Sequence, residues 1–216
     1  MPSSFFTTLK NTDLTLGGGE EVLWVTIVQK GWRTPKRVTV NLSGARSTFS
    51  WFIFVLGTHN DTFPLNIHVT HQGKESVSRV YMRTILSDSA SIDCDAISTV
   101  VGSAHGADTY LSSKALLLSE SAHAHAVPSL EILVDDIKAG HAASVDRFSP
   151  DDLFYLTSRG LSGDEAKKLL VTGFMLADCA KISDPKLVSK ITQSIEDGIS
   201  KFSVFTPTAY NLQPTT

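Results

Sequence analysis

Cysteine is scarce in this sequence of 216 residues. Only Cys94 and Cys179 are present, 85 positions apart, which excludes a disulfide framework and a Cys-x-x-Cys metal clip. The longest unbroken apolar run, residues 51–56, is far shorter than the roughly 20 residues that cross a bilayer. The first 29 residues contain a single lysine and no apolar cleavage pattern, so we expect neither a signal peptide nor a transit peptide. The sequence therefore predicts a cytoplasmic protein.

Charge is also sparse. Charged residues make up 19% of the chain, below the usual quarter, and the formal net charge is −3. This balance excludes a generally basic nucleic-acid binder. Hydrophobic residues, at 42%, suffice for a folded core in a chain of this length. We expect residues 1–148 to form a β-rich core region, residues 149–205 a helical region and residues 206–216 a loose tail.

The first region shows the two-residue alternation of β-strands and no helical stripe. Turn signals separate its apolar runs, which are rich in β-branched and aromatic residues. The runs are residues 22–28, 38–42, 49–55, 65–69, 77–86, 92–101, 116–118 and 130–134. Their centres are mostly 12 to 16 residues apart. This spacing suits a sandwich, a barrel or a coiled stack of strands, and it does not choose among them.

The second region carries helix signals. Ser149, followed by a proline and two acids, is a typical N-cap, and Gly160 is a typical C-terminal stop. Ser162 and Glu165 have the spacing of a capping box, and Asp184 precedes a proline at the start of a third helix. The sequence thus predicts three short helices after a long β region.

Polar residues that suit chemistry concentrate between residues 119 and 148. His123 and His125 fall on one face of a strand, and His141 follows after the turn-like pair Asp135-Asp136. Three imidazoles within 19 residues could converge on a metal if the chain folds back by one strand layer. Spacing alone also fits ordinary solvated histidines on a strand, so both interpretations stay open.

The remaining candidates are weaker. We interpret His105 as a turn residue, and His68 and His71 as surface residues. Cys94 lies between two aspartates, which raise the pKa of a thiol, and Cys179 fits the buried side of the second helix. The sequence contains no zinc-protease, serine-hydrolase or Walker motif, so no standard catalytic arrangement is indicated.

The stretch from Lys114 to Phe174 resembles the SufB/SufD family of iron–sulfur cluster assembly proteins. The resemblance rests on the order and spacing of five segments over about 60 residues. They are Ala115-Leu-Leu-Leu-Ser-Glu120, Val127-Pro-Ser-Leu-Glu-Ile132, Asp135-Asp-Ile-Lys-Ala-Gly-His-Ala-Ala-Ser144, Leu153-Phe-Tyr-Leu-Thr-Ser-Arg-Gly-Leu161 and Ala166-Lys-Lys-Leu-Leu-Val-Thr-Gly-Phe174.

The resemblance implies a right-handed parallel β-helix followed by a small α-helical region. It implies a non-catalytic scaffold that dimerises through the β-helix, with itself or with a SufB/SufD paralogue, and that docks an ABC-type ATPase, SufC, through its C-terminal helices. We expect Phe154, Tyr155 and Arg159 to contact that ATPase. His141 matches a family histidine at the dimer interface that is implicated in building a transient iron–sulfur cluster, and His125 is the next candidate contributor to metal binding.

Two departures separate the chain from a complete SufB. Ala122 stands where SufB-type members carry a functional cysteine, so the chain is more similar to SufD or to an undivided relative. By comparison with full-length members, we also expect it to lack the long N-terminal region and part of the β-helix. Two rival interpretations remain: a carbohydrate-active β-helix enzyme, and a purely structural subunit without metal chemistry.

Overall fold

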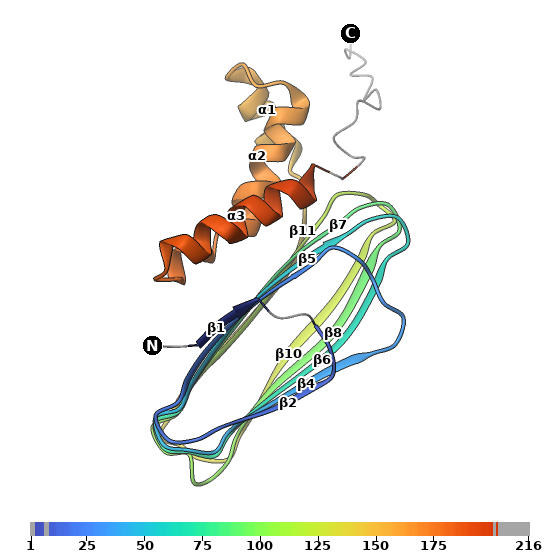
Figure 1. Cartoon of the computed structure of the whole chain (residues 1–216). Helices are drawn as coiled ribbons and strands as arrows, with labels where there is room; N and C mark the ends of the chain where they lie inside the picture. The colour runs from blue at the N-terminus through green and yellow to red at the C-terminus, as the bar shows by residue number, and fades with distance from the viewer. Residues whose placement is uncertain (1–2, 7–8, 201, 203–216) are drawn as a thin grey trace.

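The computed structural model describes residues 3–6, 9–200 and 202, with the backbone alone for residues 3–6. The predicted loose tail, residues 206–216, lies outside the described residues. The described chain forms eleven strands followed by three α-helices and a short 3₁₀ helix. Figure 1 shows the strands as a flattened coil with the helices gathered on one side.

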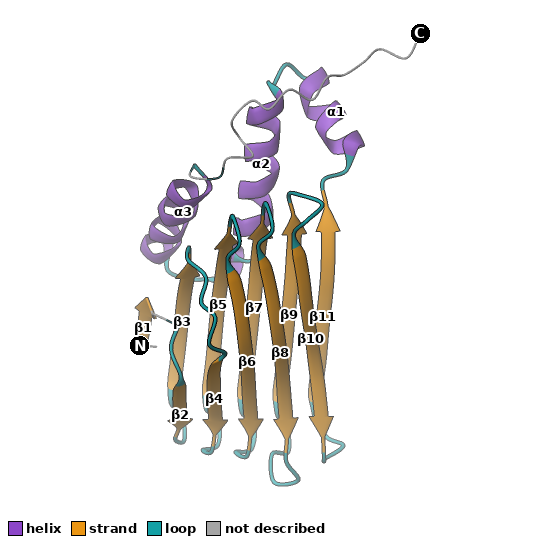
Figure 2. Cartoon of the chain, turned by 90° about the vertical axis from the view of Figure 1, so that its right-hand side faces the viewer, coloured by secondary structure: helices purple, strands orange, loops and turns teal. Residues whose placement is uncertain are grey.

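Successive strands alternate between two parallel sheets. The odd-numbered sheet contains β1 (Ser3–Phe6), β3 (Glu21–Val28), β5 (Thr48–Gly57), β7 (Val77–Leu86), β9 (Asp108–Leu117) and β11 (Lys138–Arg147), in that order. The even-numbered sheet contains β2 (Thr12–Leu16), β4 (Lys36–Leu42), β6 (Thr62–His71), β8 (Ser91–Val100) and β10 (His123–Ile132). All pairings are parallel, as Figure 2 shows for both sheets. The parallel β-helix is therefore confirmed, and the sandwich and the barrel are excluded.

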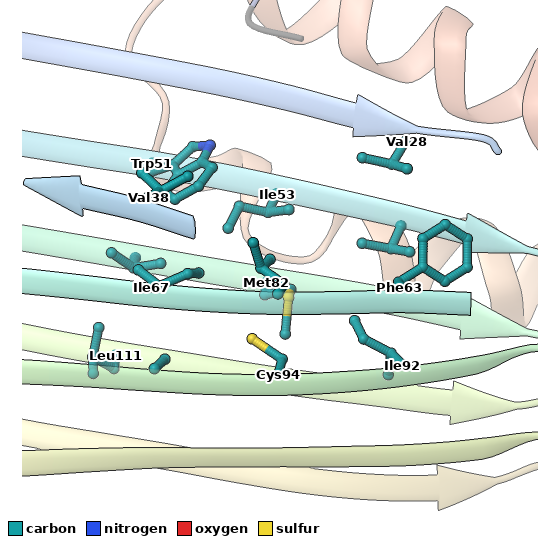
Figure 3. Packing of buried hydrophobic residues seen from close by; sticks show 14 of the residues in the cluster. Val28, Val38, Trp51, Ile53, Phe63, Ile67, Met82, Ile92, Cys94 and Leu111 are labelled. Carbon is teal, nitrogen blue, oxygen red and sulfur yellow. The ribbon is translucent and has the colours of Figure 1, made fainter. Parts of the chain in front are cut away.

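Strand β5 shows why one segment of the sequence is apolar without alternation. Trp51, Ile53 and Val55 point into the coil, where Figure 3 shows labelled core residues from both sheets packed together. Phe52 and Phe54 point outward but are equally buried, because helices cover that face. A strand buried on both faces has no polar side to display.

Helices α2 (Gly163–Leu176) and α3 (Pro185–Ile199) provide this cover, while α1 (Pro150–Ser158) packs on α2 and buries no residue of its own. The predicted caps are confirmed: Ser162 and Glu165 form a capping box, and the Asp184 carboxylate accepts hydrogen bonds from two backbone N–H groups of α3. Gly160, after α1, adopts a φ of 95°, which side chains disfavour. None of the described helices is long and apolar enough to cross a membrane.

A buried ion pair fixes the helices to the odd-numbered sheet. The Arg83 Nε atom on β7 lies 2.6 Å from a carboxylate oxygen of Asp178, and the Lys181 ammonium lies 2.7 Å from the other oxygen. The Phe174 ring lies 5.0 Å from the Arg83 guanidinium. These partners hold the pKa of Asp178 below its usual range, against the effect of burial. Because an arrangement without Asp178 at this place would leave the buried Arg83 guanidinium without a carboxylate, this contact favours one docking arrangement of the helices.

The sequence analysis missed three strands, β1, β2 and β11. Strand β11 consists mainly of small and polar residues, whose β propensity is low, and it forms because its register with β9 continues the stack. Strands β9 and β10 also begin earlier than their apolar runs indicated. Cys179 is buried as expected, but it lies in the 3₁₀ helix Cys179–Lys181, beyond the end of α2.

The prediction that His71 is a surface residue is wrong. Its side chain is fully buried inside the coil, and each ring nitrogen lies 2.8 Å from a serine hydroxyl, that of Ser76 or Ser78. Ser78 and Ser98 both hydrogen-bond to Thr109, so the network joins the two sheets. Burial lowers the pKa of His71 to about 4. The apolar/polar pattern within a single strand did not predict this network, because its members lie on different strands.

The His71 network predicts acid sensitivity. The folded chain holds His71 neutral down to pH about 4, whereas the unfolded chain takes up the proton near pH 6.5. Stability should therefore fall as pH drops from about 6.5 to 4, by about 1.4 kcal/mol for each pH unit at most. Urea unfolding at a series of pH values should show this slope in the wild type and a smaller slope in His71→Asn. His105→Asn, in an exposed turn, is the control; equal slopes for wild type and His71→Asn would contradict the assignment.

Candidate functional site at the open end of the β-helix

The last turn of the coil is open on one side. Strands β10 and β11 are the final strands of the two sheets, so each has one unpaired edge. The inner residues of earlier turns are covered by the turns that follow, but those of the last turn are not. Exposed apolar side chains gather in this turn and in the loop after β10: Val127, Ile132, Leu133 and Val145. Such an end must be covered or paired if it is not to attract other edges.

His141 lies on the inner face of this open turn. It pairs in register with Leu111 of β9, whose side chain is part of the core inside the coil. Paired residues of parallel strands point to the same side of the sheet, so His141 points the same way. No further strand follows β11 among the described residues, and the His141 side chain is exposed. An exposed imidazole is chemically able to bind iron.

His125 occupies a different face. It pairs with Asp93 of β8, which is exposed, whereas the adjacent Cys94 points into the core. His125 and His123 thus lie on the outer face of the even-numbered sheet, while His141 lies on the inner face of the other sheet. The structure does not bring the three histidines together. Within the described ranges, no three His, Cys, Asp or Glu side chains form a group that could hold a metal ion.

Sequence reasoning also missed a polar row on the outer face of the even-numbered sheet. His68 Nε2 lies 3.0 Å from the Thr99 hydroxyl, which donates to the Glu131 carboxylate at 3.0 Å. Because the hydroxyl has only one proton, the His68 ring must donate to it. The signal was present in the strand periodicity, since all three residues occupy outward positions, but their alignment depends on the register between strands.

Ala122 is fully buried in the core immediately before β10. A thiol at this position would point into the coil, away from solvent. Of the two cysteines present, both are buried, and burial raises the pKa of Cys94 to about 12 and that of Cys179 to about 11. Neither is a thiolate at neutral pH, so neither is a ready ligand or nucleophile. The pair Asp135-Asp136 lies exposed in a bend, as expected of a solvated turn.

Helix α1 displays a second unpartnered surface. Phe154 is 74% exposed and Tyr155 is 56% exposed, and Leu169 of α2 is exposed as well. The Arg159 guanidinium lies 5.3 Å from the centre of the Tyr155 ring. The structure thus places Phe154, Tyr155 and Arg159 on the surface in and just after α1, whereas His125 and His141 lie on strands β10 and β11.

A cleft of about 730 Å³ lies elsewhere, between the outer face of the odd-numbered sheet and the start of α3. Its lining includes Glu21, Arg79, Tyr81, Lys181 and Asp184, and neither candidate histidine. Arg79 is held by Asp108 at 2.6 Å, and Lys181 is held by Asp178, so both cations already have partners. The cleft is therefore separate from the open end.

Comparison with known proteins agrees with this architecture. Residues 3–174 match the family model described as the SUF system FeS cluster assembly SufBD core domain. The chain belongs to the SufBD family. The match covers the whole β-helix together with α1 and most of α2, far more than the stretch from Lys114 to Phe174 in which the sequence motifs are sharp.

Individual relatives carry the same family names. The chain is 33% identical over 159 residues to the iron–sulfur cluster assembly protein SufD of Bacillus subtilis, covering 74% of this chain and 36% of that protein. It is 32% identical to a SufBD family protein of Mycobacterium tuberculosis, covering 74% of this chain and 46% of the relative. SufD of Escherichia coli is 26% identical, with 73% and 37% covered. The SufBD chain spans less than half the length of these relatives.

Proposed function

We propose that this SufBD chain is a non-catalytic, cytoplasmic scaffold subunit of a SUF-type iron–sulfur cluster assembly complex. It pairs with a second SufBD-type chain through the open end of its β-helix, and it docks an ABC-type ATPase through α1 and α2. The observation that carries the proposal is the position of His141, on the inner face of the last described turn, where β10 and β11 each have an unpaired edge.

The open end supports pairing between two chains. Its strand edges offer backbone hydrogen-bonding groups, and its apolar side chains Ile132 and Val145, which face the inside of the coil, are exposed. An interface that covers both would satisfy the backbone and bury apolar area at the same time. His141 would then lie between the two chains, within reach of groups from either one.

His141 supports a part in handling the cluster, which is the cargo of the complex. Imidazole nitrogen is a common protein ligand for iron. One imidazole cannot hold a cluster, and this chain supplies no thiolate at Ala122. The other ligands would come from the partner chain or from sulfide, so binding by this chain alone should be weak. His125, on the outer face of the neighbouring sheet, would contribute less directly.

The helical surface supports the ATPase contact. Buried aromatic anchors with a neighbouring arginine dominate many protein interfaces, and Phe154, Tyr155 and Arg159 are such a set left exposed. The face of α2 and α3 that packs on the sheet is already occupied by core residues, so a partner can reach only the outer sides of the helices. Of these outer sides, α1 and α2 carry the exposed apolar side chains Phe154, Tyr155 and Leu169.

A purely structural subunit is the second candidate. Ala122, together with the absence of a three-ligand group among the described residues, favours it. It shares the two interfaces of the first proposal and differs only at His141, so the tests of the interfaces and of His141 separate the two candidates.

The open end predicts the oligomeric state. Light scattering at micromolar concentration should give twice 23.4 kDa for the chain alone, or a one-to-one complex after mixing with a SufB-type relative. Val145→Glu should abolish the pairing, because it places an unpaired charge in the apolar interface. Thr15→Glu, exposed on the edge strand at the other end of the coil, should leave it intact. A monomer under both conditions would refute the proposed interface.

The helical surface predicts a loss of ATPase binding on substitution. Phe154→Ala with Tyr155→Ala should weaken co-purification of a SufC-type ATPase by about tenfold or more, because exposed anchors are lost without harm to the fold. Lys190→Ala, exposed on α3, is the control. Substitution is a sharper test than truncation after residue 148, which would uncover the apolar face of β5 and β7. Unchanged binding by the double variant would assign the contact elsewhere.

His141 predicts a specific loss of cluster formation. Anaerobic reconstitution of the assembled complex should give less iron and sulfide with His141→Ala than with wild type, whereas His123→Ala should match wild type. Because the side chain is exposed, His141→Ala should change the free energy of unfolding by less than about 0.5 kcal/mol and leave the dimer intact. Equal iron and sulfide contents for wild type and His141→Ala would favour the purely structural subunit.

A further inference from the structure

The connection between β3 and β4 differs from its counterparts in later turns. It contains residues 29–35, whereas the equivalent connections contain residues 58–61, 87–90 and 118–122. Figure 1 shows it, in blue, swinging outward from the stack of strands. The extra length is not needed to connect the sheets, since shorter connections do so in every later turn.

This connection carries a concentration of positive charge in a chain whose net charge is −3. Lys30 and Arg33 lie in the loop, and Lys36 and Arg37 begin β4. Lys10 is close by, because the side chain of the next residue, Asn11, accepts a hydrogen bond from the Arg37 backbone N–H at 3.0 Å. Within the described part of the chain, none of these five cations takes part in an ion pair. We call the connection of residues 29–35, together with these five cations, the basic loop.

The basic loop is fixed to the neighbouring turn. The Gly31 N–H donates to the Asp61 carboxylate at 2.9 Å, and the Trp32 N–H donates to the Thr62 carbonyl at 2.8 Å. The Trp32 indole N–H donates to the Pro64 carbonyl at 2.9 Å, and its ring packs edge-on against Phe63. A Cβ atom on Gly31 would lie 2.7 Å from the Thr62 nitrogen, so the approach requires glycine. The cations are therefore presented on a preorganised backbone, which lowers the entropic cost of binding.

The chemistry of the basic loop restricts its partner. A membrane-binding loop inserts apolar side chains, but the indole of Trp32 is turned toward the coil and hydrogen-bonded there. A long nucleic acid would also meet the later turns, where residues 88–147 contain nine acidic and three basic residues. A short acidic segment of a protein avoids that repulsion and offers the carboxylates that arginine binds in bidentate fashion.

We propose that the basic loop, residues Lys10, Lys30, Arg33, Lys36 and Arg37, is a docking site for an acidic segment of a partner protein. The site lies in the first turns of the coil, remote in the strand order from both β10 and β11, so it can be occupied while the open end is paired. It does not depend on the proposed scaffold function.

A charge-reversal experiment tests the site. Fluorescence anisotropy would measure binding of a labelled oligoglutamate peptide to the wild-type chain and to the combined variant Lys30→Glu, Arg33→Glu and Arg37→Glu. These three side chains are exposed, so the variant should fold normally. Its dissociation constant should rise by about tenfold or more, and added salt should weaken wild-type binding. The control combines Lys74→Glu, Lys186→Glu and Lys190→Glu, which change the net charge equally at exposed positions elsewhere.

Several outcomes would overturn the proposal. One is that the peptide does not bind the wild-type chain at low salt. Another is that the control variant loses as much binding as the basic-loop variant, which would show that net charge alone governs binding. Tighter binding of DNA oligonucleotides or of phosphatidylserine vesicles than of the peptide, lost in the basic-loop variant, would assign the loop to another class of partner. Preserved binding by a correctly folded control, with loss in the basic-loop variant, would support it.

Discussion

The structure depends on the in-register stacking of inward-facing side chains along the coil. Each turn presents the same inner positions as the turn before, so Trp51 stacks on Val80 and Val80 on Leu111. Burying each such side chain contributes roughly 1.5–3 kcal/mol, but only when a neighbour covers it. Each turn contributes only one strand to each sheet, so the inner side chains of a turn are covered only when a neighbouring turn packs beside them. The coil is therefore stable as a stack and exposed wherever the stack ends.

This dependence explains why the two candidate interfaces lie where they do. At β10 and β11 the stack stops, and inner positions such as His141 and Val145 become surface. On the outer face of the odd-numbered sheet, α2 and α3 complete the burial, and the pairing of Arg83 with Asp178 selects one docking arrangement. Helix α1 has no such partner within the described chain and keeps its aromatic side chains exposed.

Polar groups inside the coil also depend on neighbouring turns, because a buried polar group without a hydrogen-bond partner is destabilising. His71 is tolerated only because Ser76 and Ser78 satisfy both ring nitrogens, and Thr109 continues the network to the other sheet. A buried network of this kind favours one register over others, since a shift by one residue would leave its members without partners. Apolar stacking supplies the stability of the coil, and the network supplies part of its specificity.

The sequence by itself determined the change from strands to helices after Arg147, the helix caps and the β-rich character of the first region, because these depend on neighbouring residues. The family motifs between Lys114 and Phe174 predicted the parallel β-helix, whereas the strand periodicity did not distinguish it from a sandwich or a barrel. Strand β11 could not be read from composition, since its small residues become a strand only through pairing with β9. The faces of His125 and His141, the burial of His71 and the row from His68 to Glu131 were likewise decided by the tertiary structure. Each of them depends on register between strands far apart in sequence, which no local pattern encodes.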